Sequence, residues 1–194
     1  MKLGEKRLRG REPIYVLDAT AIIHFAKVGK LHLVSDICEA YITKEVYSET
    51  VEGGGYPDSL IIRDVVDDGG LRVYDVEDER ALEVLLRHPE IHAGEAEALA
   101  AAKELDGLAV IDEEEARSLA RIYGIRSAPG TIFLLFRLLN LERMDAEEAD
   151  ETLSRLIASG LYLDPKTLIR VKEKLKEYRG RRQRNSDCHM RYGA

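Results

Sequence analysis

The sequence is poor in residues that mark several classes of protein. It has only two cysteines, Cys38 and Cys188, which lie far apart in a chain of 194 residues. This spacing excludes a cysteine-rich zinc ribbon and fits a reducing compartment. Tryptophan is absent and 6% of the residues are aromatic. An aromatic stacking platform for single-stranded nucleic acid is therefore not evident.

Long apolar runs are also missing. No stretch approaches the roughly 20 apolar residues of a membrane span, and the N-terminal MKLGEKRLRGRE lacks the apolar centre of a secretion signal. We therefore expect a cytoplasmic protein that does not enter a membrane. The 45% of hydrophobic residues is enough for one well-buried core.

Charge is distributed unevenly along the chain, whose net charge is −7. Residues 1–12 have a balance of +3 and residues 166–194 a balance of +7, which leaves −17 between them. An acidic body is not expected to bind nucleic acid over its whole surface, although its basic ends can hold phosphates. We predict a basic tail at 1–12, one domain at 13–179 and a basic tail without fixed structure at 180–194.

Short apolar segments alternate with helical patterns along this domain. Strands are predicted at 14–18, 40–42, 71–76, 108–111 and 125–127. Helical patterns cover 21–28, 31–39, 43–52, 57–66, 77–88, 94–106, 112–123, 131–139, 145–159 and 164–178, the first of them capped by Thr20. Such alternation implies right-handed crossovers and parallel strands. The predicted fold is an α/β, three-layer α/β/α sandwich with a central, mostly parallel sheet.

Acidic residues follow two of the predicted strands. Asp18 ends the first, and Asp112 ends the strand at 108–111, with Glu113 directly after it. Glu95 lies in the first turn of an alanine-rich helix, and Glu49 in the last turn of the helix at 43–52. Ligands of open parallel sheets bind beyond the carboxyl ends of the strands. Clustered carboxylates repel one another there, whereas a divalent cation with oxygen ligands would stabilise them.

Each acid also has an ordinary structural explanation. Asp18 fits a turn at the end of a strand, and Glu95 and Glu97 fit favourable charges at a helix N-terminus. Glu45 and Glu49 lie four residues apart on one side of a helix, so one of them can simply face solvent.

The order of the acidic motifs resembles that of the PIN-domain family. The resemblance is carried by YVLDATAIIHFAKVGKLHLV, ITKEVYSETVE, HAGEAEALAAAKELDGLAVIDEEEARSLARIYGI and APGTIFLLFRLL, and spans roughly residues 14–178. It is greatest to prokaryotic PIN-like proteins whose second acidic motif reads Gly-Glu-x-Glu-Ala. PIN domains are metal-dependent nucleases, mostly ribonucleases, and many are the toxins of toxin–antitoxin pairs.

The resemblance implies a set of catalytic and metal-binding residues. The implied metal ligands are Asp18, Glu49, Glu95, Asp112 and Glu113, with Thr20 as the hydroxyl partner of Asp18. Two departures leave alternatives open. The strand-end pair is commonly two aspartates, so either Asp112 or Glu113 could approach the metal. Prolines often found before the second helix are absent, so Glu45 could replace Glu49.

The resemblance further implies a Mg²⁺- or Mn²⁺-dependent endoribonuclease with RNA as substrate, an antitoxin protein as a possible partner and a homodimer as its assembly. Basic residues such as Lys27, Lys44 and Arg117 and those of 172–184 would hold the RNA. One alternative is a non-catalytic PIN-like module that binds RNA or protein. A phosphatase of the haloacid-dehalogenase kind is disfavoured, because Thr20 stands where its second aspartate is usual.

Overall fold

The computed structural model describes residues 12–53 and 57–192, and for 181–192 it describes the backbone alone. The predicted basic tail at 1–12 therefore lies, up to residue 11, outside the described residues. The strands are β1 (Ile14–Leu17), β2 (Glu39–Thr43), β3 (Arg72–Tyr74), β4 (Leu108–Ile111) and β5 (Ser127–Pro129). The α-helices are α1 (Ala19–Lys27), α2 (Lys44–Tyr47), α3 (Pro57–Asp67), α4 (Glu79–Leu86), α5 (Ala93–Glu104), α6 (Glu114–Ile122), α7 (Gly130–Asn140), α8 (Ala146–Ala158) and α9 (Pro165–Tyr192). A 3-10 helix covers Leu31–Asp36, and a π-helical turn covers Ser48–Glu52.

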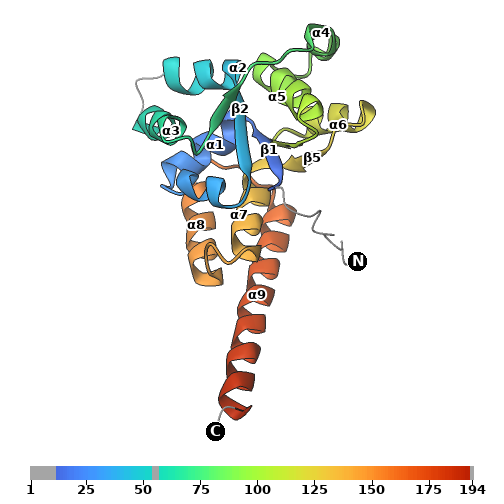
Figure 1. Ribbon diagram of the computed structural model, residues 1–194. Coiled ribbons are helices and arrows are strands. Elements are labelled where there is room, and N and C mark those ends of the chain that lie inside the picture. Colours follow the sequence, from blue (N-terminus) through green and yellow to red (C-terminus); the bar gives the residue numbers. More distant parts are fainter. Residues whose placement is uncertain (1–11, 54–56, 193–194) are drawn as a thin grey trace.

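The described strands form one five-stranded parallel sheet in the order β3-β2-β1-β4-β5. β1 and β4 are neighbours, with Leu17 opposite Val110. The chain builds the sheet outward from β1 on one side and then from β4 on the other, so the direction of winding reverses between them (Figure 1). In such sheets the loops beyond the carboxyl ends of these two strands diverge and leave room for a ligand.

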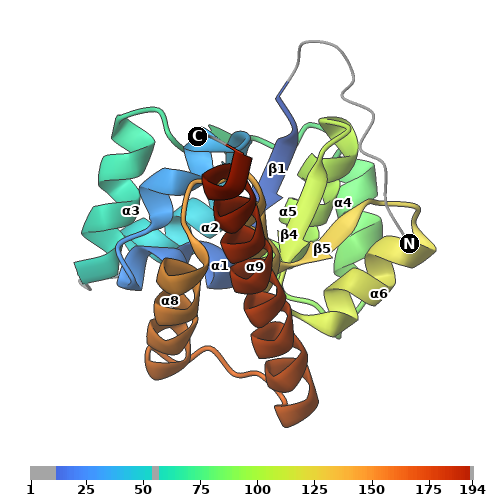
Figure 2. The same ribbon diagram turned by 90° about the horizontal axis from the view of Figure 1, so that it is seen from below.

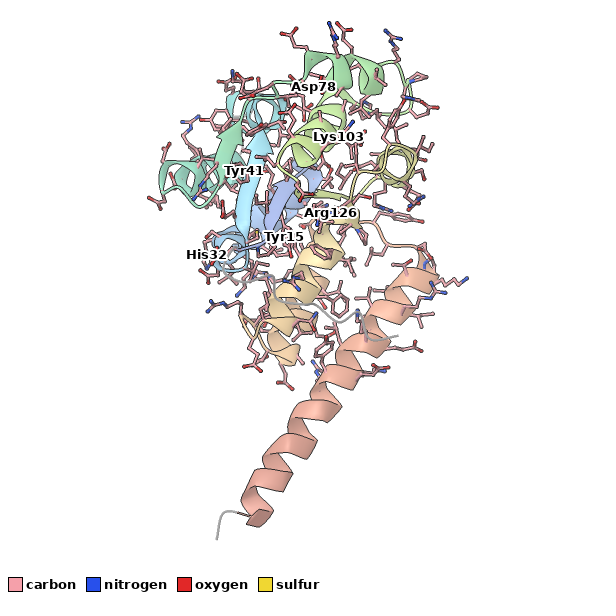
Figure 3. The ribbon with its side chains drawn as sticks, turned by 45° about the vertical axis from the view of Figure 1, so that its right-hand side comes forward. Tyr15, His32, Tyr41, Asp78, Lys103 and Arg126 are labelled. Carbon is pink, nitrogen blue, oxygen red and sulfur yellow. The ribbon has the colours of Figure 1, made fainter. Side chains whose placement is uncertain are left out.

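Helices cover both faces of the sheet, as predicted for a three-layer α/β/α sandwich. On one face, apolar residues from α1, α3, α7, α8 and α9 pack around Tyr15, Leu17 and Val110, and we call this the α7 core. On the other, residues from α4, α5 and α6 pack around Val16 and Ile111, the α5 core. Successive strand residues alternate between these cores because side chains alternate along a strand. Tyr15 on β1 faces the α7 core and Tyr41 on β2 the α5 core (Figure 3).

Small residues dominate the buried side of α5. Its buried alanines are Ala96, Ala98, Ala100, Ala101 and Ala102. Helix α5 contacts β1, β2 and β4. Side chains of this size let the helix lie close against the sheet in a densely packed interior. The N-terminal turn of α5 therefore stands close to the carboxyl edge of the sheet.

The first helix begins earlier than predicted. Thr20 was expected to cap a helix starting at Ala21, but α1 starts at Ala19 and Asp18 occupies the N-cap position. The backbone at Asp18 is still extended, with φ −78° and ψ 160°. Strand β1 therefore passes into α1 without an intervening turn, and Thr20 lies within the first helical turn.

The C-terminal helix is longer than predicted. A tail without fixed structure was expected from residue 180, yet the backbone of α9 continues to Tyr192, and of this tail residues 193–194 lie outside the description. Val171 and Leu175 of α9 are buried, and Tyr178 contacts Asn140 and the Phe136 ring. Once these contacts fix the first turns, adding further turns is far less costly than nucleating a helix. Figure 2 shows α9 beside α8, and Figure 1 shows it continuing away from the body.

Membrane insertion was not expected from the sequence. Among the described residues, no helix combines the length and the apolar character that spanning a bilayer requires.

Candidate functional site

Two of the predicted acids, Asp18 and Glu113, interact where the winding of the sheet reverses. Asp18 follows β1, and the Asp112-Glu113 pair follows β4. The Asp18 backbone N–H donates a hydrogen bond of 3.1 Å to the Val110 carbonyl, which ties the two strand ends together. The sheet itself thus fixes the backbone from which these acids project.

Asp18 is almost completely buried, with 4% of its surface exposed. Burial, together with the negative charges of Glu113 and Glu95, raises the pKa of Asp18 to about 7. The backbone N–H groups of Ala19 and Thr20 oppose this rise in pKa, because they stabilise the carboxylate. The Asp18 carboxylate is therefore disfavoured as an isolated charge and is suited to a cation.

Glu95 is also buried, with 5% of its surface exposed. Its carboxylate accepts a hydrogen bond of 2.8 Å from the His92 backbone N–H, at the start of α5. Burial raises the pKa of Glu95, and Glu113 raises it further by its charge and by a side-chain hydrogen bond. The Glu95 and Glu113 carboxyl groups therefore lie close enough to influence each other.

Glu113 stands at the N-cap position of α6, in an extended conformation with φ −73° and ψ 128°. Its Oε2 atom is buried and has no hydrogen-bond partner among the described residues. A buried, unpartnered carboxylate oxygen is unfavourable unless a proton or a cation accompanies it. This orphaned atom makes the chemistry of the Asp18, Glu95 and Glu113 set fit a divalent cation.

Asp112 has a different environment. The Thr131 backbone N–H lies 3.0 and 3.1 Å from its two carboxylate oxygens, and the Thr131 hydroxyl donates to Oδ2 at 2.6 Å. Thr131 is completely buried in the first turn of α7. The charge of Asp112 also acts on His24 of α1. Burial lowers the pKa of His24, and Asp112 opposes this lowering. Asp112 thus faces α7 and α1.

Glu49 lies beside the buried acids. It is exposed and projects over the start of α5, where a Cβ atom at Gly94 would come within 3.2 Å of its Oε2. Partial burial and the charge of Glu45 raise the pKa of Glu49, and His92 opposes this. Glu97 instead accepts a hydrogen bond of 3.2 Å from the Glu45 backbone N–H and so caps the start of α2.

Two of the basic residues expected to hold RNA already have acidic or carbonyl partners. Lys44 pairs with Asp75 at 2.5 Å. Arg117 donates to the carbonyl oxygens of Ile111 and Asp112 and pairs with Glu114. Arg117 therefore stabilises the end of β4, a role that its position in the sequence did not reveal.

A separate hollow of about 390 Å³ is lined by Tyr74, Glu77, Asp78 and Glu104. The Glu104 carboxylate there accepts hydrogen bonds from the Tyr74 hydroxyl and from the backbone N–H groups of Glu77 and Asp78. These contacts already satisfy Glu104, and they join β3 and α4 to the end of α5.

The structure therefore divides the predicted acids into three groups. Asp18, Glu95 and Glu113 interact with one another, Asp112 is bound to Thr131, and Glu49 lies next to the start of α5. Among residues 12–53 and 57–192, no group of three or more His, Cys, Asp or Glu side chains is arranged so that it could hold a metal ion. A metal would thus have to draw the carboxylates closer together.

Sequence reasoning did not identify Gly130. A Cβ atom there would lie 2.5 to 2.6 Å from the carboxyl carbon and oxygens of Asp112, closer than any real contact of this kind. The signal in the sequence is the Gly130-Thr131 pair at a predicted helix start, which could place a hydroxyl near the acids or simply cap the helix.

Comparison with known proteins supports the resemblance found in the sequence. A family model described as a PIN domain matches residues 14–177, which is most of the chain. A search of curated proteins finds no match.

Proposed function

The chain belongs to the PIN-domain family, and from this premise we propose that it is a Mg²⁺- or Mn²⁺-dependent endoribonuclease. PIN domains are generally nucleases. The observation that carries the proposal is the group formed by Asp18, Glu95 and Glu113 at the carboxyl edge of β1 and β4. It contains two almost completely buried acids and a carboxylate oxygen that has no hydrogen-bond partner in the described part of the chain.

Asp18, Glu95 and Glu113 would hold the ion, with Glu49 and Asp112 at the border of the site. When bound, Mg²⁺ or Mn²⁺ supplies an acidified water and neutralises charge at the leaving oxygen of a phosphodiester. The chain contributes fixed carboxylates on a rigid sheet edge, and α1 and α5 exclude water from Asp18 and Glu95. Thr20, in the first turn of α1, would steady the Asp18 carboxylate through its backbone N–H.

The test is cleavage of a labelled single-stranded RNA in Mg²⁺ or Mn²⁺, with EDTA as a metal-free reference. Asp18→Asn keeps the shape of the side chain and removes its charge, so we expect a rate at least about 100-fold lower. Asp36→Asn is the matched control, because Asp36 is exposed on the 3-10 helix, and its rate should equal that of the wild type. Equal cleavage by wild type and Asp18→Asn would falsify the proposal.

A non-catalytic PIN-like module is the second candidate. It is favoured by one observation, namely that no group of three acidic or other ligating side chains is arranged for an ion among the described residues. Isothermal titration separates the two, since a protein that takes up no Mn²⁺ at millimolar concentration cannot use it for cleavage.

The family resemblance also supports a proposal for the partners and the location. We propose a cytoplasmic protein that acts on RNA, forms a homodimer and serves as the toxin of a toxin–antitoxin pair. An antitoxin would approach the acidic site with a basic segment, because the body of the chain is strongly acidic. A short regulator-like reading frame directly upstream of the gene would support this role.

A further inference from the structure

The neighbours Asp112 and Glu113 point to opposite faces of the sheet. Along β4, Val110 packs into the α7 core and Ile111 into the α5 core. The same alternation continues past the strand, since Asp112 reaches Thr131 on α7 and Glu113 reaches Glu95 on α5. Asp18 follows this rule on β1, because Leu17 faces the α7 core and Asp18 interacts with Glu95 and Glu113.

The contacts of Asp112 are directed at the start of α7. Three donor-acceptor distances between 2.6 and 3.1 Å join its carboxylate to the backbone N–H and hydroxyl of Thr131. A carboxylate at a helix N-terminus also interacts favourably with the helix dipole. Gly130 has no side chain to obstruct this approach, and any Cβ there would overlap the carboxylate. The first turn of α7 is therefore shaped around Asp112.

The peptide after Asp112 is fixed from the other side as well. Arg117 on α6 donates to the carbonyl oxygens of Ile111 and Asp112. With its side chain held by Thr131 and its carbonyl by Arg117, Asp112 has little freedom. The backbone that leads into Glu113 is thereby fixed in the orientation that turns the Glu113 side chain toward Asp18 and Glu95.

We propose that Asp112 and Thr131 form a clamp that positions Glu113, and that Glu113 rather than Asp112 completes the metal-binding set with Asp18 and Glu95. Asp112 and Thr131 are positioning residues that act through Glu113. This inference rests on the proposed nuclease function for the role of Glu113, whereas the clamp itself is independent of any metal.

The clamp is tested first on metal-free protein by thermal unfolding. Thr131→Val and Asp112→Asn each remove a charge-assisted hydrogen bond and should lower the midpoint by about 5 °C. The midpoint of the double variant should be little lower than that of either single variant, because both changes break the same interaction. Thr131→Ser keeps the hydroxyl and should restore most of the loss. Thr152→Val, at an equally buried threonine of α8, is the control for removing a buried hydroxyl elsewhere.

The role of Glu113 is tested by Mn²⁺ titration of the same proteins and of Glu113→Gln. Glu113→Gln should leave the metal-free midpoint unchanged or higher, since it removes a negative charge that lies beside Asp18 and Glu95. It should weaken Mn²⁺ binding by about 100-fold. Asp112→Asn and Thr131→Val should weaken it by about tenfold, as expected for residues that support a ligand.

Two results would overturn the inference. One is an Asp112→Asn protein that keeps its midpoint but loses Mn²⁺ binding completely, which would make Asp112 the ligand. The other is a Glu113→Gln protein with unchanged Mn²⁺ affinity. A wild-type protein that neither binds Mn²⁺ nor cleaves RNA instead contradicts the proposed function, and the unfolding series then still decides whether the clamp exists.

Discussion

At the scale of single residues, the burial of Asp18 makes the stability of the protein depend on pH. Its side chain is buried beside Glu113 and Glu95, and its pKa is raised from 3.8 to about 7. The folded protein therefore keeps a proton on Asp18 at pH values where the unfolded chain has released it. Because the folded pKa is the higher one, this stabilisation is complete below about pH 4 and is lost as pH rises to about 7 and above.

This linkage predicts that wild type and Asp18→Asn, both in EDTA, differ in free energy of unfolding by an amount that depends on pH. The free energy of unfolding of the variant, relative to wild type, should increase between pH 4 and pH 8 by at most about 4 kcal/mol, the equivalent of the pKa shift. Urea unfolding across this pH range measures the difference. A gap between the two proteins that stays constant with pH would contradict the assignment of the raised pKa to Asp18.

At the scale of elements, the alanines of α5 control how Glu95 meets the edge of the sheet. Ala98 lies one turn after Glu95 and is completely buried. Ala98→Leu should lower stability by about 1–3 kcal/mol, because the added atoms push α5 away from the strands. Since Glu95 is carried on the same helix, Mn²⁺ affinity should fall as well.

The control for this change is Ala93→Leu, at an exposed position of the same helix. Urea unfolding and Mn²⁺ titration of both variants provide the comparison. If Ala98→Leu reduced stability but left Mn²⁺ affinity equal to that of the wild type, Glu95 would not depend on the packing of α5.

Much of the fold followed from the sequence because its local signals agree with its tertiary structure. The strand at Leu108–Ile111 was predicted with its observed bounds, and parallel strands were sufficient to place Asp18 and Asp112 at one edge. The division between Asp112 and Glu113 was left open. The alternation of side chains along β4 indicates that Asp112 and Glu113 lie on opposite faces. Assigning a role to each also requires knowing which face α5 covers. The Gly130-Thr131 pair fitted either a hydroxyl near the acids or a helix cap, and only the fold shows that Thr131 contacts Asp112.

At the scale of the whole molecule, α9 extends a basic segment away from an acidic body (Figure 1). Deleting residues 181–194 removes three net positive charges. The buried residues Val171 and Leu175 remain, so the unfolding midpoint should change by no more than about 2 °C. If this segment holds RNA, affinity should fall and the slope of log affinity against log salt should become shallower by about 2.

Binding should be measured between 50 and 200 mM salt with Asp18→Asn present in both the full-length and shortened chains, so that the RNA stays intact. An unchanged salt dependence would show that α9 beyond residue 180 does not neutralise RNA phosphates.

The pairing of β1 with β4 determines when the acidic site can form during synthesis. β1 is made early in synthesis, but its partner β4 and the first turn of α7 are made much later. Pairing of segments this distant is a slow, late event in folding. A nascent chain that contains β1 through β3 carries Asp18 without Glu95, Glu113 or the Thr131 contact. If the protein cuts RNA as proposed, its nascent chain does not cleave the RNA of the ribosome that makes it until synthesis of the domain is well advanced.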